Sequence, residues 1–144
     1  MIAALAAGAI SCTAFEPEVG DRLATCVDSD SNPSSAVDFK TQVRPIIATR
    51  CANCHYYSKG TKEGVNAVHF QMDELDDLRK GGTNSGANIV VPGKPCSSVI
   101  VQKLRGTFPI GARMPKNGPP YLSPEQIQLF MDWIAEGAKG DDQD

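Results

Sequence analysis

The feature that most constrains this chain is the pentapeptide Cys51-Ala52-Asn53-Cys54-His55. Its C-x-x-C-H spacing is typical of a c-type haem attachment site. In such a site both thiols form thioethers with the haem vinyl groups, and the histidine ligates iron through an imidazole nitrogen. Two intervening residues make nearly one helical turn, which brings both sulfurs to one edge of the ring. We therefore predict one covalent haem c held by Cys51, Cys54 and His55.

Three other interpretations of the motif are a zinc half-site, a thioredoxin-like redox pair and coincidence. A structural zinc ion usually needs a second pair of Cys or His ligands at matching spacing. The remaining cysteines and the second histidine of this chain are scattered singly. A redox C-x-x-C is expected beside a βαβ pattern, which this sequence lacks. The haem interpretation is therefore preferred.

The second iron ligand is predicted in the segment 108–121, which is too rich in helix breakers for a regular element. The breakers are Pro109, Gly111, Pro115, Gly118, Pro119 and Pro120. Met114 lies among them, and a methionine thioether is a haem ligand of electron-carrying cytochromes. The competing side chains are Met72, Met131 and His69, of which the two methionines are expected in the core. We predict Met114 as the ligand.

Hydrophobic spacing predicts an all-α protein of about four to five short helices around the haem. The first is expected over residues 37–50, with a kink or restart at Pro45. Residues 56–70 are expected to form a loop, and two short helices are expected over residues 72–80 and 96–105.

The last predicted helix has the clearest boundaries. Ser123 and Gln126 form a capping box with Pro124 in the first turn, and Gly137 ends the helix. The apolar residues Ile127, Phe130, Met131 and Ile134 recur along one face. Trp133 lies beside this face, where it packs either on the haem or on a neighbouring helix.

The N-terminal part of the chain divides into a leader and an extension. Residues 1–11 are uncharged and apolar, and they resemble a bacterial lipoprotein signal that ends at Cys12. Two departures are Ala9 in place of the usual leucine and the lack of a positively charged start. A lipid anchor on Cys12, ordinary secretion and a structured N-terminus are the three interpretations. Residues 12–36 are predicted to form an extension and linker, 37–140 the haem domain, and 141–144 an acidic tail.

The five cysteines leave three outside the haem motif. If Cys12 carries lipid, Cys26 and Cys96 remain as the natural disulfide, although connectivity cannot be read from sequence alone. We predict this pair, which implies an oxidising compartment. The net charge of −3 lacks the basic signature of nucleic-acid binders, and no run of 18 apolar residues predicts a transmembrane helix.

Residues 39–140 resemble the class I cytochromes c, in particular the small bacterial mono-haem domains. The matching segments are Val43-Arg44-Pro45-Ile46, Cys51 to His55, Val91 to Pro95, Met114-Pro115, Leu122 to Ile127, Trp133-Ile134 and Gly137-Ala138. Cys96 and the cysteine-bearing extension depart from the family pattern.

The resemblance implies that the terminal helices cross beside the haem, with His55 proximal and Met114 distal. It also implies that the proximal histidine donates its other N–H to the carbonyl of a proline segment, for which Pro92 is our candidate. Arg113, Tyr121 and Trp133 are further predicted cofactor contacts. The basic side chains near the ligand loop are predicted to steer an acidic redox partner; they are Lys94, Lys103, Arg105, Arg113 and Lys116.

A six-coordinate His/Met iron has no free position for substrate, so the site favours a single-electron carrier over an enzyme. We expect a mono-haem cytochrome c that works with redox partner proteins outside the cytoplasm, either periplasmic or tethered as a lipoprotein. The alternatives are a fixed haem subunit of a larger respiratory or filament assembly, and an open-site haem sensor or peroxidase.

Overall fold

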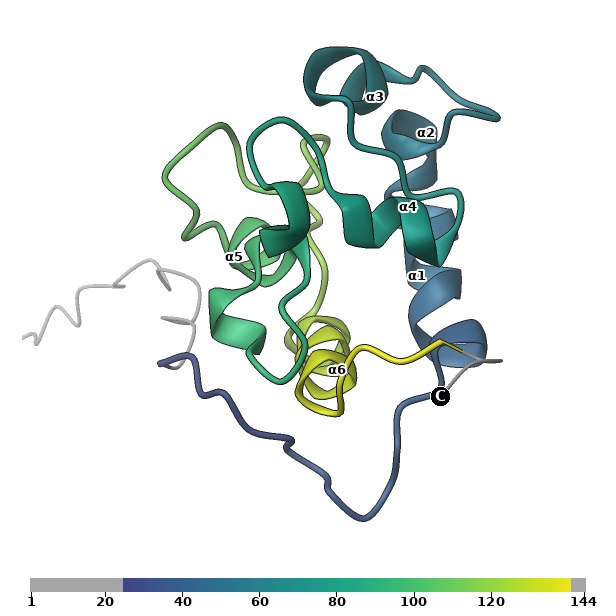
Figure 1. Cartoon of the computed structure of the whole chain (residues 1–144). Helices are drawn as coiled ribbons and strands as arrows, with labels where there is room; N and C mark the ends of the chain where they lie inside the picture. Colours follow the sequence, from purple (N-terminus) through teal and green to yellow (C-terminus); the bar gives the residue numbers. More distant parts are fainter. Residues whose placement is uncertain (1–24, 141–144) are drawn as a thin grey trace, which may run out of the picture.

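The computed structural model describes residues 25–140, and within that range the protein is helical and contains no strand (Figure 1). The α-helices are α1 (Arg44–Arg50), α2 (Ala52–His55), α3 (Glu63–Val68), α4 (Leu75–Lys80), α5 (Val99–Arg105) and α6 (Pro124–Ala135). Three shorter helical segments are η1 (Phe39–Val43), η2 (Gly86–Ile89) and η3 (Pro95–Ser97). The all-α prediction is confirmed.

None of the helices in residues 25–140 combines the length and apolar character that a membrane span requires. The predicted leader 1–11, the candidate lipid site Cys12 and the acidic tail 141–144 lie outside the described residues.

The first helix begins at a polar cap and changes its winding at a proline. The Asp38 carboxylate accepts hydrogen bonds from the Thr41 backbone N–H at 2.7 Å and the Thr41 hydroxyl at 2.6 Å. Residues Phe39–Val43 then wind as a π-helix, and an α-helix restarts at Arg44 with Pro45 in its first turn. Proline has no N–H to donate and is therefore best placed in a first turn, as the sequence predicts.

Helix α6 begins where its capping residues predict. The Ser123 hydroxyl accepts from the Gln126 backbone N–H at 3.3 Å, and the Gln126 side chain accepts from the Ser123 N–H at 3.0 Å. The apolar face of α6 is buried in the core against η1, η3 and α5. The least exposed large side chains of this core are Val43, Ile47, Leu78, Val101, Phe130, Trp133 and Ile134.

Two sequence predictions differ from the structure in the middle of the chain. The segment expected to be a loop contains the short helix α3, and α4 begins at Leu75 rather than near Met72. Helix α3 has only one buried apolar residue, Val65, so its sequence carries little helical periodicity. It forms because it packs against α2, which is a tertiary contact that local sequence does not encode.

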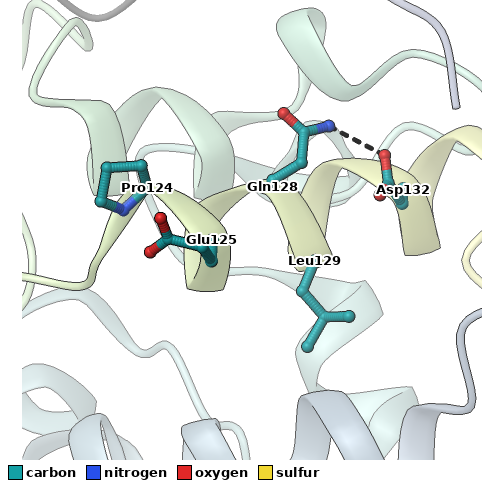
Figure 2. Close-up of a pocket in the computed structure, with 5 residues that line it drawn as sticks. All are labelled: Pro124, Glu125, Gln128, Leu129 and Asp132. Atoms are coloured by element: carbon teal, nitrogen blue, oxygen red, sulfur yellow. Dashed lines mark hydrogen bonds between the residues drawn. The ribbon is translucent and has the colours of Figure 1, made fainter. Parts of the chain in front are cut away.

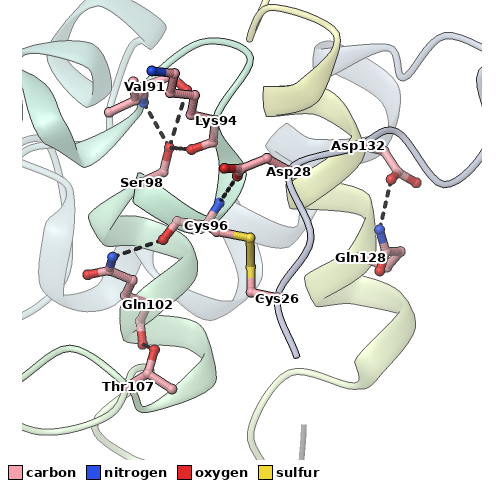
Figure 3. Close-up of a disulfide and its surroundings, with 10 residues drawn as sticks. All are labelled: Cys26, Asp28, Val91, Lys94, Cys96, Ser98, Gln102, Thr107, Gln128 and Asp132. Atoms are coloured by element: carbon pink, nitrogen blue, oxygen red, sulfur yellow. Dashed lines mark hydrogen bonds between the residues drawn. A yellow bond between two sulfur atoms is a disulfide. The ribbon is translucent and has the colours of Figure 1, made fainter. Parts of the chain in front are cut away.

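Residues 25–37 form an extended strap that passes under α6 in Figure 1. A disulfide joins Cys26 to Cys96 in η3, with 5.7 Å between the Cα atoms (Figure 3). The Asp28 carboxylate accepts from the Cys96 N–H at 2.7 Å, which fixes the strap beside the disulfide. The predicted Cys26–Cys96 pairing is confirmed.

The strap is then held along α6 by two carboxylates. Asp132, which is buried, accepts from the Ser31 N–H at 2.9 Å and the Ser31 hydroxyl at 2.6 Å. Glu136 accepts from the Val37 N–H at 2.7 Å. The segment that composition predicted to be a linker is therefore attached to the domain at three places.

Candidate functional site

The C-x-x-C-H motif lies at the junction of α1 and α2. The Cys51 carbonyl accepts from the N–H groups of Cys54 at 3.1 Å and His55 at 2.9 Å, so the five residues form a single tight turn. Cys51 and Cys54 are both free thiols and are partly accessible. The structure therefore brings the three predicted attachment residues into one turn.

The His55 ring is oriented by a hydrogen bond to the backbone of Phe70. Nδ1 lies 3.1 Å from the Phe70 carbonyl oxygen. Because a carbonyl only accepts, Nδ1 carries the proton, and the Nε2 lone pair is the one available for a metal. The backbone of the same turn is tied down as well, since the Met72 N–H donates to the His55 carbonyl at 2.8 Å.

This partner corrects the prediction made for Pro92. Pro92 is exposed in a turn after η2, whereas the adjacent Gly93 N–H donates to the Ile134 carbonyl of α6 at 2.7 Å. The carbonyl that orients His55 is that of Phe70, in the segment between α3 and α4. No sequence signal marks Phe70 for this role, because the bond uses a backbone atom.

A glycine makes room for the His55 ring on its other side. A Cβ added to Gly64 would lie 2.3 Å from His55 Cε1, 2.5 Å from Nδ1 and 2.8 Å from Nε2. Only glycine therefore fits at this position of α3 without displacing the imidazole. A glycine within a helix, nine residues after the motif, is the signal that sequence analysis overlooked.

The titration of His55 follows from this enclosure. Burial lowers the pKa of the imidazole, the hydrogen bond to Phe70 opposes that shift, and the positive charge of Lys103 lowers the pKa further. The neutral imidazole is therefore favoured at neutral pH, and it is the form that ligates metals.

Cys51 has the opposite character to a redox-active thiol. Burial raises the pKa of the Cys51 thiol to about 12, so this sulfur is protonated at neutral pH. Nucleophilic cysteines of thiol–disulfide enzymes have lowered pKa values. The environment of Cys51 therefore disfavours the thioredoxin-like interpretation. No group of three or more His, Cys, Asp and Glu residues in residues 25–140 is placed to hold a metal ion, so the motif meets no second ligand pair there.

The loop that carries Met114 is anchored on α5. The Met114 N–H donates to the Lys103 carbonyl at 2.9 Å, and Arg113 Nε donates to the Leu104 carbonyl at 2.8 Å. The Arg113 guanidinium lies 4.1 Å from the centre of the Tyr121 ring. The structure thus groups three predicted cofactor residues, Met114, Arg113 and Tyr121, on one loop, and Met114 itself is half-buried.

The two competing methionines and Trp133 belong to the protein core. Met72 is 5% exposed and Met131 is 6% exposed, as predicted for core side chains. Trp133 is 1% exposed, packs on Phe39 with 5.2 Å between ring centres, and donates from Nε1 to the Lys139 carbonyl. No ring surface of Trp133 is left for a cofactor, so its role is core packing.

The basic side chains predicted to steer a partner are largely engaged within the protein. Lys116 forms an ion pair with Glu63, Arg113 binds the α5 backbone, and Lys103 binds backbone carbonyls of the ligand loop. Lys94 is exposed. These contacts give three of the five residues a structural role, and the prediction that the group steers a partner stays a prediction.

The surface also has a shallow hollow of about 380 Å³ on α6, shown in Figure 2. Its lining residues are Pro124, Glu125, Gln128, Leu129 and Asp132. None of them belongs to the predicted site, and Gln128 is bound to Asp132 at 2.8 Å. The hollow therefore presents no chemistry that competes with the cysteine–histidine turn.

Free Cys51 and Cys54 and the oriented His55 thus lie in one turn, and Met114 lies on a separate loop that is anchored to α5. Comparison with known protein families, curated protein sequences and solved structures finds no match to this chain.

Proposed function

We propose that this protein binds one haem covalently through Cys51 and Cys54 and carries single electrons between redox proteins. The observation that carries the proposal is the geometry of His55. Its Nδ1 is held by a backbone carbonyl while Nε2 stays available, and two free thiols lie within the same turn. Metal-ligating histidines typically donate their other ring N–H to a backbone carbonyl or a carboxylate, as His55 does here.

Each residue of the turn has a defined task in this proposal. Cys51 and Cys54 would hold the haem through two thioethers, and His55 and Met114 would ligate its iron. The bound haem provides the one-electron chemistry. Gly64 leaves space for the imidazole, and the bond to the Phe70 carbonyl restrains rotation of the ring.

The disulfide supports an extracytoplasmic location. Structural disulfides persist in oxidising compartments, where c-type haem is also attached. Cys26 and Cys96 are joined while Cys51 and Cys54 remain free, so the chain separates its bridging cysteines from its attachment cysteines.

Intact mass tests the attachment directly. Expressed in cells that attach c-type haem, the protein is expected to carry one haem that survives denaturation and acid–acetone extraction. Replacing Cys51 and Cys54 by serine should abolish this added mass, whereas the matched Cys26→Ser/Cys96→Ser variant should retain it. Purified wild-type protein without covalent haem would overturn the proposal.

The ligand set is tested by absorption spectroscopy and potentiometry. Met114→Ala is expected to remove the red charge-transfer band of ferric Met ligation and lower the midpoint potential, because a thioether favours the ferrous state. Met72→Leu and Met131→Leu should keep the band. An unchanged band in Met114→Ala would exclude Met114 as the ligand, and an open-site haem would then be favoured.

A further inference from the structure

Lys103 has an unusual position among the lysines of this protein. It lies on α5 with its side chain half-buried, and Nζ donates to two backbone carbonyls, Ile110 at 2.8 Å and Ala112 at 2.7 Å. Both carbonyls belong to the loop that leads to Met114. The ammonium thus lies on the inside of that loop and binds it at two points.

The backbone of Lys103 binds the same loop a third time. Its carbonyl accepts from the Met114 N–H at 2.9 Å and from the Gly106 N–H at 3.3 Å. Gly106 follows α5 directly, and Met114 ends the excursion. Lys103 therefore binds the segment 106–114 at its first residue, at the carbonyls on both sides of Gly111 and at its last residue.

The loop itself is shaped to receive the ammonium. Gly111 has a φ of +70°, and a Cβ added there would lie 3.3 Å from Lys103 Nζ. The positive φ is a conformation that glycine adopts readily and other residues rarely do. It lets the carbonyls on either side of Gly111 converge on the same cation.

We propose that Lys103 is a positioning residue that fixes the loop carrying Met114. This inference rests on the proposed haem function, and it assigns Lys103 a role that docking does not require. Its three contacts with the loop, two through Nζ and one through its own carbonyl, hold Met114 at a defined place.

The test compares Lys103→Met, which keeps the aliphatic length but removes the charge and both hydrogen bonds, with Lys103→Arg, which retains a cation with several donors. Lys94→Met is the matched control, since it removes an exposed lysine from a neighbouring segment. The first readout is amide hydrogen exchange at Met114 and across residues 106–114. We expect exchange in Lys103→Met to accelerate on the order of tenfold or more, because two charge-assisted bonds are lost. Lys103→Arg should restore much of the protection, and Lys94→Met should match wild type.

The second readout is the haem itself. Lys103→Met should weaken the red charge-transfer band and lower the midpoint potential, because a loosened loop weakens ligation by Met114. Lys103→Arg should recover most of both, and Lys94→Met should change neither. Wild-type exchange and potential in Lys103→Met would overturn the inference.

A measurement on wild-type protein keeps the inference testable if Lys103→Met does not fold. The Nζ protons of Lys103 should exchange with water more slowly than those of Lys94, because two carbonyls hold them. Equal exchange at the two ammonium groups would overturn the inference. The exchange experiments report on the loop whether or not haem is bound, so their result is separate from that of the mass measurement on Cys51 and Cys54.

Discussion

At the scale of single residues, the imidazole of His55 has room only because the residue against it, Gly64, has no Cβ. Alanine at position 64 favours a helix over glycine by about 0.5–1 kcal/mol, but overpacking a filled site costs about 1–3 kcal/mol. The overlap is with the ring of His55, which its bond to Phe70 holds in place. The steric cost of a Gly64→Ala substitution is therefore larger than its gain in helix propensity.

We predict that Gly64→Ala destabilises the protein by about 1–2 kcal/mol in urea unfolding and, in the haem-bound form that we propose, perturbs the His55 ligation spectrum. Asn66→Ala is the control, since it lies on an exposed position of the same short helix. It should be neutral or slightly stabilising. A Gly64→Ala variant as stable as wild type would show that His55 is free to move.

A second residue-scale prediction concerns Glu136, whose Oε1 is buried without a hydrogen-bond partner. Burial raises the pKa of this carboxyl from its ordinary 4.5, the Val37 N–H opposes the shift, and the charges of Asp30 and Asp132 raise the pKa further. A carboxyl with a raised pKa favours the folded state most when protonated, and this contribution is lost as pH rises through the raised pKa.

Glu136→Gln should therefore stabilise the protein near neutral pH, and its advantage should fade as pH falls to about 4. Glu125→Gln is a control in which the change in stability at neutral pH is expected to have the opposite sign. A hydrogen bond with Ser123 lowers the pKa of Glu125, so this variant should lose a little stability at neutral pH. Thermal unfolding at the two pH values measures both effects, and a Glu136→Gln variant less stable than wild type at neutral pH would contradict the first.

At the scale of elements, α6 depends on its N-terminal cap. Ser123→Ala removes the hydroxyl that accepts the Gln126 N–H, and loss of such a cap typically costs about 1 kcal/mol. Ser123→Asp keeps an acceptor and should retain most of the stability. Urea midpoints of the three proteins measure this difference, and equal midpoints for Ser123→Ala and wild type would mean that tertiary packing alone fixes the start of α6.

The contrast between α6 and α3 explains which elements the sequence could predict. The signals for α6 are local: a cap, a proline in the first turn and four apolar residues on one face. Helix α3 has a single buried apolar residue, and left-handed residues, Lys62 and His69, flank both of its ends. Nothing local distinguishes it from a loop, so its helical state depends on the contact with α2.

The candidate site divides in the same way. Cys51, Cys54 and His55 are recognisable because covalent chemistry requires those side chains at that spacing. The groups that orient the site are backbone carbonyls. The Phe70 carbonyl binds His55, and the Ile110 and Ala112 carbonyls bind Lys103. Every residue has a carbonyl, so residue identity cannot reveal which one is used. The choice of Pro92 was wrong for this reason.

At the scale of the whole molecule, the disulfide and the two carboxylate contacts attach the strap to the rest of the domain. The bridge closes a loop between positions 70 residues apart, and such a cross-link typically contributes about 2–4 kcal/mol. Cys26→Ser/Cys96→Ser should therefore lower the unfolding free energy by about that amount. Its haem spectrum should match wild type, because the strap follows α6 and not the turn around His55. A changed ligation spectrum would show that the strap supports the haem site.

The strap also imposes an order on the assembly of the chain. The hydrogen bonds made by residues 51–55 join positions at most about 17 residues apart, such as His55 with Phe70 and Met72. The strap bonds join Ser31 to Asp132 and Val37 to Glu136, across 101 and 99 positions. During synthesis the turn of residues 51–55 can thus close before α6 is made, whereas the strap can bind only after Asp132 and Glu136 have been added. The thiols of Cys51 and Cys54 therefore become organised before the strap can attach to α6.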